Sequence, residues 1–384
     1  MKKFILTFLI IIIASFSGNA FADDFTDGII ESMTEEYYGE FDNAVEQSGG
    51  DSFIDFDAEK IIKRAARGEE LFSLENLLSA IFQKLMHEIT LIAKSMVCLF
   101  AVSILGSFLF AAAEKEDGNS AAAAKLCIYM VSAGIMASVF ANASETAVDA
   151  VGRLSVFLKA VFPVIIASLY SIGCVSSVAV LQPVIAAAIQ LSVHLTEKLF
   201  IPVITVSFAV CCVNTLSKEI NADKLIQFLQ KSVKTCLAAM LIIFIGLVGI
   251  ESIATSSADG LAIKLTKFAA SNLVPVVGGI LSESVETVMG CSQVIKNSVG
   301  ICGIIATLYL CLAPMLKLGA SIIVLRISAA VMEPVCDKRI IKCISDAAGA
   351  VSMLFAMVAS VAVMFILITA IIINTGNSAI ITGR

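Results

Sequence analysis

The chain has 384 residues, of which 58% are hydrophobic and 15% are charged, whereas a soluble domain has roughly 45–50% apolar and about 25% charged residues. This composition excludes an ordinary soluble enzyme and predicts a chain that lies mostly in lipid. The formal net charge of −6 belongs to one short segment, because 16 acidic and 4 basic residues lie between Asp23 and Glu75, while 16 acidic and 20 basic residues follow. No basic stripe with interleaved aromatic residues occurs, so we expect no nucleic-acid partner.

The first 22 residues are typical of a secretory signal peptide. Lys2 and Lys3 precede an apolar run from Phe4 to Phe16, and Ala20-Phe21-Ala22 fits a small-residue cleavage site. The apolar run of 13 residues is shorter than the roughly 20 residues that a membrane crossing needs. The sequence therefore predicts a signal peptide over 1–22 and a mature N-terminus outside the cytoplasm, with an uncleaved anchor as the alternative.

An acidic extracytoplasmic segment is predicted over residues 23–88. Its first part, Asp23 to Asp51, is acidic and contains glycine, and we expect it to be loosely ordered or to order on a partner. From Leu74 onward, apolar residues recur at the i, i+3, i+4 spacing of a helix. This spacing predicts an amphipathic helix over 74–88 that lies on the outer membrane face or packs against partners and can continue into the first span.

The cysteines and histidines do not predict a disulfide framework, a metal site or a cofactor. All eleven cysteines lie in or beside apolar segments from Cys98 onward, their number is odd, and no C-x-x-C motif occurs. The two histidines, His87 and His194, are more than a hundred residues apart, so a zinc or haem site has no support.

Eight apolar runs follow, and they predict an all-α polytopic membrane helix bundle over residues 89–384. If the chain starts outside and crosses at each run, residues 217–234 and 333–348 are cytoplasmic, and both are rich in Lys and Arg as the positive-inside rule requires. The segment around 299–335 can form one tilted span with an interfacial helix, or a hairpin broken at Pro314, so seven to nine spans remain possible. The runs are Ile89 to Ala113, Leu126 to Ala143, Leu154 to Ile172, Val178 to Leu195, Leu199 to Leu216, Thr235 to Ala254, Val299 to Leu325 and Ala350 to Ile373.

Prolines and isolated charges within these runs leave two interpretations open. Five of the six prolines lie within apolar stretches, which is typical of the broken helices of transporters and channels, but also of ordinary kinks in a packed bundle. Lys317 lies within the run Val299 to Leu325 and Arg326 directly follows it, nine residues further on. On a straight helix they face opposite sides, so they cannot both line the same pore.

The segment from Asp259 to Gly300 is predicted to lie on the outer side of the membrane. Lys264 and Lys267 are one helical step apart, the sequence Pro275-Val276-Val277-Gly278-Gly279 interrupts the helix, and Glu283 and Glu286 are again one step apart. We therefore expect two short amphipathic helices that fold back on each other, with the lysine pair facing the glutamate pair. A solvated loop is the alternative.

The strings KFAASNLVPVVGG (residues 267–279) and ETVMGCSQVIKNSVG (residues 286–300), behind a signal peptide, an acidic segment and a series of spans, resemble the stage III sporulation protein AE family of endospore-forming bacteria. Ile295 occupies the aliphatic position before Lys296-Asn297, a mild departure from the family pattern. The resemblance implies a mother-cell protein of the outer forespore membrane, made with seven companion proteins of one operon, among them other membrane proteins. With a forespore membrane partner, these proteins form a transenvelope channel similar to specialised secretion systems, and the family is needed for late forespore gene expression.

Two functions from different classes are therefore expected, a non-enzymatic subunit of a channel complex and, as the alternative, a stand-alone secondary transporter. The halves of the chain share no evident repeat and midplane carboxylates are missing, which favours the first. No nucleotide-binding loop, H-E-x-x-H or G-x-S-x-G motif occurs, so an enzyme is not expected. The candidate assembly or conduit residues are Lys264, Lys267, Asn272, Pro275, Gly278, Gly279, Glu283, Glu286, Lys296 and Asn297.

Overall fold

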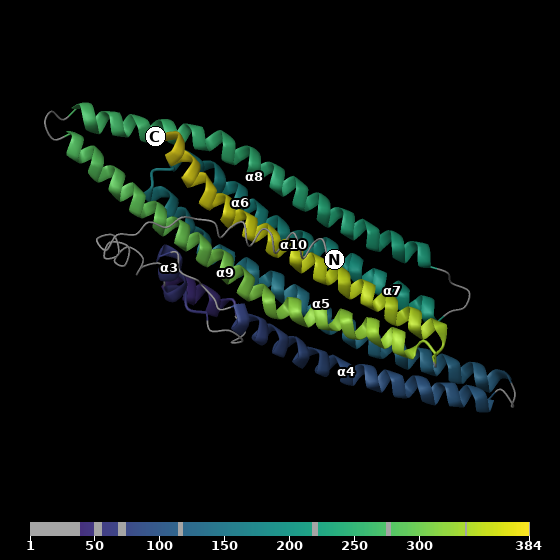
Figure 1. The fold of residues 1–384 in the computed structure, drawn as a ribbon. Coiled ribbons are helices and arrows are strands. Elements are labelled where there is room, and N and C mark those ends of the chain that lie inside the picture. The colour runs from purple at the N-terminus through teal and green to yellow at the C-terminus, as the bar shows by residue number, and fades with distance from the viewer. Residues whose placement is uncertain are drawn as a thin grey trace.

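The computed structural model describes residues 39–49, 56–67, 74–113, 118–216, 222–273, 278–334 and 336–383. Within these ranges the chain is helical and forms no strand, and the long helices lie side by side in an elongated bundle (Figure 1). The predicted all-α class is therefore confirmed. The predicted signal peptide over 1–22 lies outside the described residues.

Each long helix of the bundle is continuous over far more residues than one membrane crossing needs. The elements, labelled as in Figure 1, are α3 (Ala58–Arg67), α4 (Leu74–Ala113), α5 (Gly118–Ser171), α6 (Val175–Leu195), a π-helical turn (Thr196–Phe200), α7 (Ile201–Leu216), α8 (Asp223–Leu273), α9 (Gly278–Met332) and α10 (Lys338–Gly383). At about 1.5 Å per residue, the 54 residues of α5 extend over about 80 Å. The hydrocarbon core of a bilayer is about 30 Å thick.

Two pairs of the predicted spans lie on continuous helical stretches. The run 126–143 and all but the last residue of the run 154–172 belong to α5, because the polar residues between them include no proline and are compatible with a helix. The runs 178–195 and 199–216 are joined by the π-helical turn Thr196–Phe200. This wider turn ends two residues before Pro202 and helps to accommodate its ring without ending the helix.

Six helical segments are long and apolar enough to cross a membrane within the described ranges. The prediction of eight spans is therefore not confirmed, and neither is the range of seven to nine. The six segments are Leu78–Gly106, Leu126–Tyr170, Val175–Thr215, Asp223–Gly246, Gly290–Met332 and Lys338–Asn374.

The prolines do not break the helices. Pro163, Pro183 and Pro314 lie inside α5, α6 and α9, and each of these helices continues on both sides of its proline. The alternative hairpin at Pro314 is therefore wrong. The predicted amphipathic helix over 74–88 does run on into the first span, as the single helix α4.

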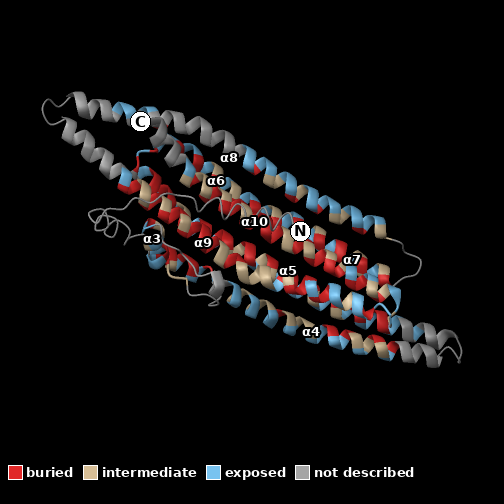
Figure 2. Ribbon diagram, in the orientation of Figure 1, coloured by how far each residue is buried: buried red, intermediate tan, exposed pale blue. Residues whose placement is uncertain are grey.

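Helices α9 and α10 pack against each other at the centre of the bundle, with α5 and α8 beside them. In Figure 2 the buried residues concentrate on α5, α9 and α10, whereas α4 and the described part of α8 are largely exposed. In the most apolar 18-residue segment of each helix, 67% of the residues are buried in α10, but only 22% in α4 and 17% in α8. α4 and α8 lie on opposite sides of the bundle in Figure 1, so both of these outer sides present apolar surface.

Part of the acidic segment is ordered against the bundle, contrary to the expectation for Asp23 to Asp51. Residues 39–47 form a helix, and Phe41, which is fully buried, packs edge-on against Phe157 of α5 with ring centroids 6.4 Å apart. The backbone carbonyl of Gly49 accepts a hydrogen bond from Arg153 Nη1 at 2.5 Å. The aromatic anchor supplies the apolar contact that acidic composition alone does not suggest.

Helix α3 extends this docking and packs against α9. Asp57 caps its first turn, because Asp57 Oδ1 accepts a hydrogen bond from the Lys60 amide at 3.0 Å. Asp42 Oδ1 accepts a second one from the Ala58 amide at 3.1 Å. The hydrogen bond from the Lys60 side chain lowers the pKa of Asp57, whereas burial raises the pKa of Asp42.

Candidate functional site

A buried polar layer lies at one end of the bundle, where the turn between α5 and α6 meets α8, α9 and α10. We define it by Cys174, Ser176, Ser177, Asp259 and Lys296. Asp259 is 1% exposed, and its Oδ1 and Oδ2 accept hydrogen bonds from the backbone amides of Ser176 and Ser177, both at 2.9 Å. A charged side chain of α8 therefore caps the N-terminus of α6.

The local sequence explains why α6 takes its cap from another helix. The chain reverses at Gly173, whose φ of 81° lies in the left-handed region that favours glycine. The N-cap position of α6 is Cys174, which makes no side-chain capping hydrogen bond. The first amides of α6 therefore lack a local acceptor, and a carboxylate suits them because the N-terminal end of a helix carries partial positive charge.

Lys296 of α9 is the second charged residue of the buried polar layer. It is 1% exposed, and its Nζ donates a hydrogen bond to the backbone carbonyl of Ile373 in α10 at 2.6 Å. Cys174 lies within the electrostatic influence of both charges: burial and the negative charge of Asp259 raise the pKa of its thiol to about 11, against an opposing effect of Lys296. The layer thus joins an acid and an amine from neighbouring helices around an uncharged thiol.

The contact between Asp259 and α6 also constrains the topology. It places the turn at Gly173 and the C-terminal part of α8 at the same end of the bundle. Eight separate crossings would place three spans between these points and put them on opposite sides of the membrane. The structure places two helical passes between them, the α6–α7 stretch and α8, so eight crossings do not fit this geometry.

The two helices predicted on either side of Pro275 are the ends of two long helices. α8 ends at Leu273 and α9 begins at Gly278, so the interruption falls at the predicted Pro275 region. The helices on either side are not short, because α8 and α9 have 51 and 55 residues. No strong helix breaker separates residues 255–273 from the preceding span, and the helix therefore continues.

The candidate residues of this segment have different outcomes. Lys264 is exposed, whereas Lys296 is buried between α9 and α10. Asn297 is partly exposed, but its Oδ1 is buried and has no hydrogen-bond partner among the described atoms. Pro275 lies outside the described residues. The side chains of the other candidates also lie outside the description, namely those at Lys267, Asn272, Gly278, Gly279, Glu283 and Glu286. The pairing of the two lysines with the two glutamates therefore stays a prediction.

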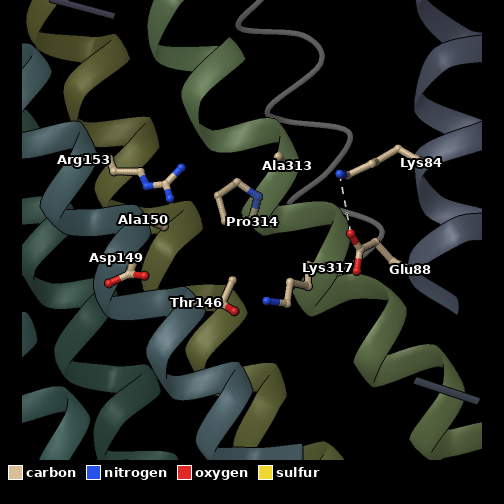
Figure 3. A pocket seen from close by; sticks show the side chains of 9 residues that line it. All are labelled: Lys84, Glu88, Thr146, Asp149, Ala150, Arg153, Ala313, Pro314 and Lys317. Atoms are coloured by element: carbon tan, nitrogen blue, oxygen red, sulfur yellow. Dashed lines mark ion pairs between the residues drawn. The ribbon is translucent and has the colours of Figure 1, made fainter. Parts of the chain in front are cut away.

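A second polar region is a charged pocket of about 110 Å³ between α4, α5 and α9 (Figure 3). Lys84 Nζ and Glu88 Oε1 are 3.7 Å apart, and Figure 3 shows the side chains of Arg153 and Lys317 reaching into the space between α5 and α9. Lys317 lines the pocket and Arg326 does not, as expected for residues on opposite sides of α9. The lining residues are Lys84, Glu88, Thr146, Asp149, Ala150, Arg153, Ala313, Pro314 and Lys317.

At the opposite end of the bundle from the buried polar layer, polar contacts join α7, α8 and α10. Asn214 Nδ2 donates to Asp223 Oδ1 at 2.9 Å, and Lys342 of α10 forms an ion pair with the same carboxylate. Tyr129 of α5 donates to Asp337 Oδ2 at 2.9 Å. These contacts fix the turns at the end that carries the Lys and Arg residues of the predicted cytoplasmic segments.

The sequence interpretation missed the capping role of Asp259 and the whole charged pocket. The amides that Asp259 binds are 82 and 83 residues away, so no local motif indicates the contact. The pocket residues come from three helices, but one signal was present: Lys84 and Glu88 precede the first apolar run, and Asp149 and Arg153 fall between the second and third. Charges that flank neighbouring apolar runs lie at similar depth when the helices are antiparallel.

Comparison with known proteins identifies relatives of the chain. The sequence profile of the family described as Stage III sporulation protein AE matches residues 56–376. The curated Stage III sporulation protein AE of Bacillus subtilis (strain 168) is 27% identical over 318 residues, which cover 81% of this chain and 78% of the relative. No solved structure matches the chain.

Proposed function

Because the chain belongs to the stage III sporulation protein AE family, we propose that it is a non-enzymatic membrane subunit of a multiprotein channel complex in sporulating cells. In this proposal the protein lies in the outer forespore membrane and assembles with companion membrane proteins of its operon and a forespore membrane partner. The complex supports late gene expression in the forespore. The companions, and not this chain, would supply any nucleotide-driven work.

The observation that carries this proposal is the distance between exposed apolar residues on α8. Large apolar side chains are exposed between Leu225 and Ile245 and again at Leu261 and Leu265, and the first and last of these residues are about 60 Å apart at 1.5 Å per residue. Even at a tilt of about 40°, they are separated by about 46 Å along the membrane normal, more than the roughly 30 Å of a hydrocarbon core. The hydrocarbon core therefore does not cover both groups, and another protein helix is the partner that we propose for the outer one.

The uncovered part lies at the outer end of α8. Leu261 and Leu265 are each 60% exposed, lie one helical turn apart, and follow the apolar segment Asp223–Gly246. We define these two residues as the outer apolar pair. The exposed Lys264 lies beside them, which supports its candidate role in assembly.

The distribution of charge supports an extracytoplasmic N-terminus. With six crossings and the start outside, the ends of α7 and α9 and the starts of α8 and α10 are cytoplasmic. Lys224, Lys338, Arg339 and Lys342 lie there, which agrees with the positive-inside rule. Residues 39–47, α3 and the buried polar layer then lie on the outer side.

The stand-alone transporter loses its main support, because the proline-containing helices α5, α6 and α9 are continuous. Transporters of the broken-helix type place unwound backbone at their binding sites. Within the described ranges the interruption closest to this is the π-helical turn Thr196–Phe200, which does not end the helical path.

The direct test is the native mass and composition of the tagged protein, gently solubilised from sporulating cells. A stable particle that contains several other membrane proteins in fixed ratio is the expected result. A particle of this chain alone, combined with solute uptake in liposomes, would contradict the proposal and favour the transporter. A tagged unrelated polytopic protein from the same cells, solubilised in parallel, controls for co-solubilised neighbours.

A further inference from the structure

We propose that the charged pocket between α4, α5 and α9 binds the phosphate group of an anionic phospholipid, with Lys317 and Arg153 as its cationic contacts. This inference rests on the lining, the surroundings and the size of the pocket, and it does not depend on the proposed function. Figure 3 shows the charged side chains that carry it.

The charges that line the pocket favour an anion. Lys84 is close to Glu88, at 3.7 Å, so these two charges largely offset each other. Arg153 and Lys317 then face only one further carboxylate, that of Asp149. The side-chain ammonium of Lys317 makes no hydrogen bond or ion pair within the described part of the chain, and Arg153 donates to the neutral carbonyl of Gly49. Two cationic groups therefore remain available to a phosphate, which both Lys and Arg bind well.

The pocket is flanked by apolar residues on all three helices. On α4 it adjoins the start of the apolar run at Ile89, on α5 it lies between the runs that end at Ala143 and begin at Leu154, and on α9 Pro314 and Lys317 lie within an apolar run. From the pocket, the apolar surfaces of all three helices extend toward the same end of the bundle, because α5 runs antiparallel to α4 and α9 (Figure 1). The exposed large apolar side chains of the three helices in this direction are Leu91, Val97, Leu105, Leu126, Met130, Val131, Ile323, Ile327 and Val331.

The length of this surface suits the acyl chains of a lipid. From Glu88 to Leu105 on α4 there are 17 residues, or about 26 Å, and one leaflet of the hydrocarbon core is about 15 Å thick. A headgroup in the pocket would therefore place its acyl chains along α4 and α9 within the bilayer. A free phosphate ion would use the same cationic contacts but would gain nothing from the apolar surface.

The pocket is large enough for a phosphate group. Its volume is about 110 Å³, whereas one ordered water needs at least about 10–15 Å³ measured with a comparable probe. Pro314 lines the pocket, and a proline inside a helix leaves the carbonyl four residues earlier without its helical hydrogen bond. The pocket is therefore polar and roomy, as a hydrated headgroup requires.

The test measures lipid binding to the delipidated full-length protein by native mass spectrometry. Dioleoyl phosphatidylglycerol and dioleoyl phosphatidylcholine, which share acyl chains and differ in net charge, are titrated separately. We expect tighter binding of phosphatidylglycerol and a loss of affinity of about fivefold or more in K317Q, since one basic residue near anionic lipid contributes about 1 kcal/mol. D149N, which removes the negative charge, is expected to bind phosphatidylglycerol more tightly.

The matched control is R326Q, which removes an exposed charge from the same helix, α9, outside the pocket. It should leave the affinity unchanged, and an equal loss in K317Q and R326Q would overturn the proposal, as would equal binding of the two lipids. Inorganic phosphate that displaces phosphatidylglycerol from the wild type but not from K317Q would assign the pocket to a free phosphate and overturn the lipid. Thermal unfolding of each variant identifies any that fails to fold, and K317R then replaces K317Q with the expectation of retained binding.

Discussion

The carboxylate of Asp259 accepts a hydrogen bond from the backbone amide of Ser177 at 2.9 Å and joins α8 to the first turn of α6 across 82 residues of sequence. Asp259 is 1% exposed, so water does not reach this site to accept hydrogen bonds from the two amides in its place. The contact therefore fixes the end of the bundle where the buried polar layer lies.

Replacement of Asp259 is expected to destabilise the protein in a graded way. D259A leaves the amides of Ser176 and Ser177 without their acceptor in a buried position, at a cost of about 1–3 kcal/mol. D259N keeps one of the two acceptor oxygens, loses the charge and places an NH₂ group against the second amide, so it is expected to destabilise less than D259A, which removes both acceptors. In thermal unfolding of the solubilised protein, we expect the melting temperature to fall from wild type to D259N and further to D259A. Glu145 is an exposed acid on α5, and E145Q is the control that should leave the melting temperature unchanged. A stability of D259A equal to that of wild type would show that the cap is not formed.

The close packing of α9 on α10 predicts opposite effects for two glycines of the same helix. A Cβ at Gly300 would lie 2.3 Å from Ile373 Cγ1, whereas a Cβ at Gly290 would have no atom within 4 Å. G300A should therefore destabilise by about 1–3 kcal/mol through overpacking. G290A should be neutral or stabilise by up to about 1 kcal/mol, since alanine favours a helix over glycine. Chemical denaturation of the two variants compares them, and an equal response would contradict the close approach.

The fold class was predictable because apolar composition and helical spacing determine it directly. The number of crossings was not, because polar residues such as Glu145 and Asp149 look like loop residues in the sequence but continue a helix when neighbouring helices bury the opposite face. The role of Asp259 depends on amides more than eighty residues away, and the charged pocket depends on three helices that meet only in the folded chain. Lys296 was selected from its motif, and its burial against the Ile373 carbonyl emerges only from the packing of α9 on α10.

The topology is testable at the first residue of α6. Val175 is 56% exposed, and six crossings with an outer N-terminus place it outside, whereas eight crossings place it in the cytoplasm. Cys98 and Cys127 are the exposed native cysteines of the described residues, and both are first replaced by serine. In this background, V175C should react with a membrane-impermeant maleimide on intact cells. K338C, at the start of α10, should react only after the cells are permeabilised. Protection of V175C in intact cells would show that this turn is cytoplasmic. The chain would then cross the membrane an odd number of times before it, as eight crossings require.

The docking of the acidic segment is expected to weaken at low pH. The pKa of Asp57 is lowered by its hydrogen bond with Lys60, so the stability that this carboxylate contributes is present above the ordinary pKa of an aspartate and is lost as the pH falls through the lowered value. The exposed position of this pair limits the effect. Limited proteolysis of α3 should therefore accelerate below pH 4 in wild type, and D57N should show this faster cleavage already at neutral pH. Equal cleavage of the two proteins at neutral pH would argue against the cap.

The outer apolar pair gives the sharpest test of the subunit proposal. Leu261 and Leu265 lie beyond the apolar segment of α8 and are each 60% exposed, so their replacement by asparagine removes apolar contact area without opening a cavity inside the chain. L261N/L265N should therefore keep the thermal stability of the isolated protein but lose its partners on purification from sporulating cells. Burial of one leucine side chain contributes about 1.5–3 kcal/mol, so the loss of two is large enough to dissociate a complex of ordinary affinity.

The matched control for the outer apolar pair is L261M/L265M, which keeps the apolar area and the helix propensity. It should retain the partners of the wild type. If the asparagine and methionine variants co-purify with the same proteins in the same ratio, the outer apolar pair is not an interface, and the subunit proposal loses the observation that carries it. If only the asparagine variant loses them, cross-linking from Lys264, which is exposed beside the pair, identifies the helix that covers this surface.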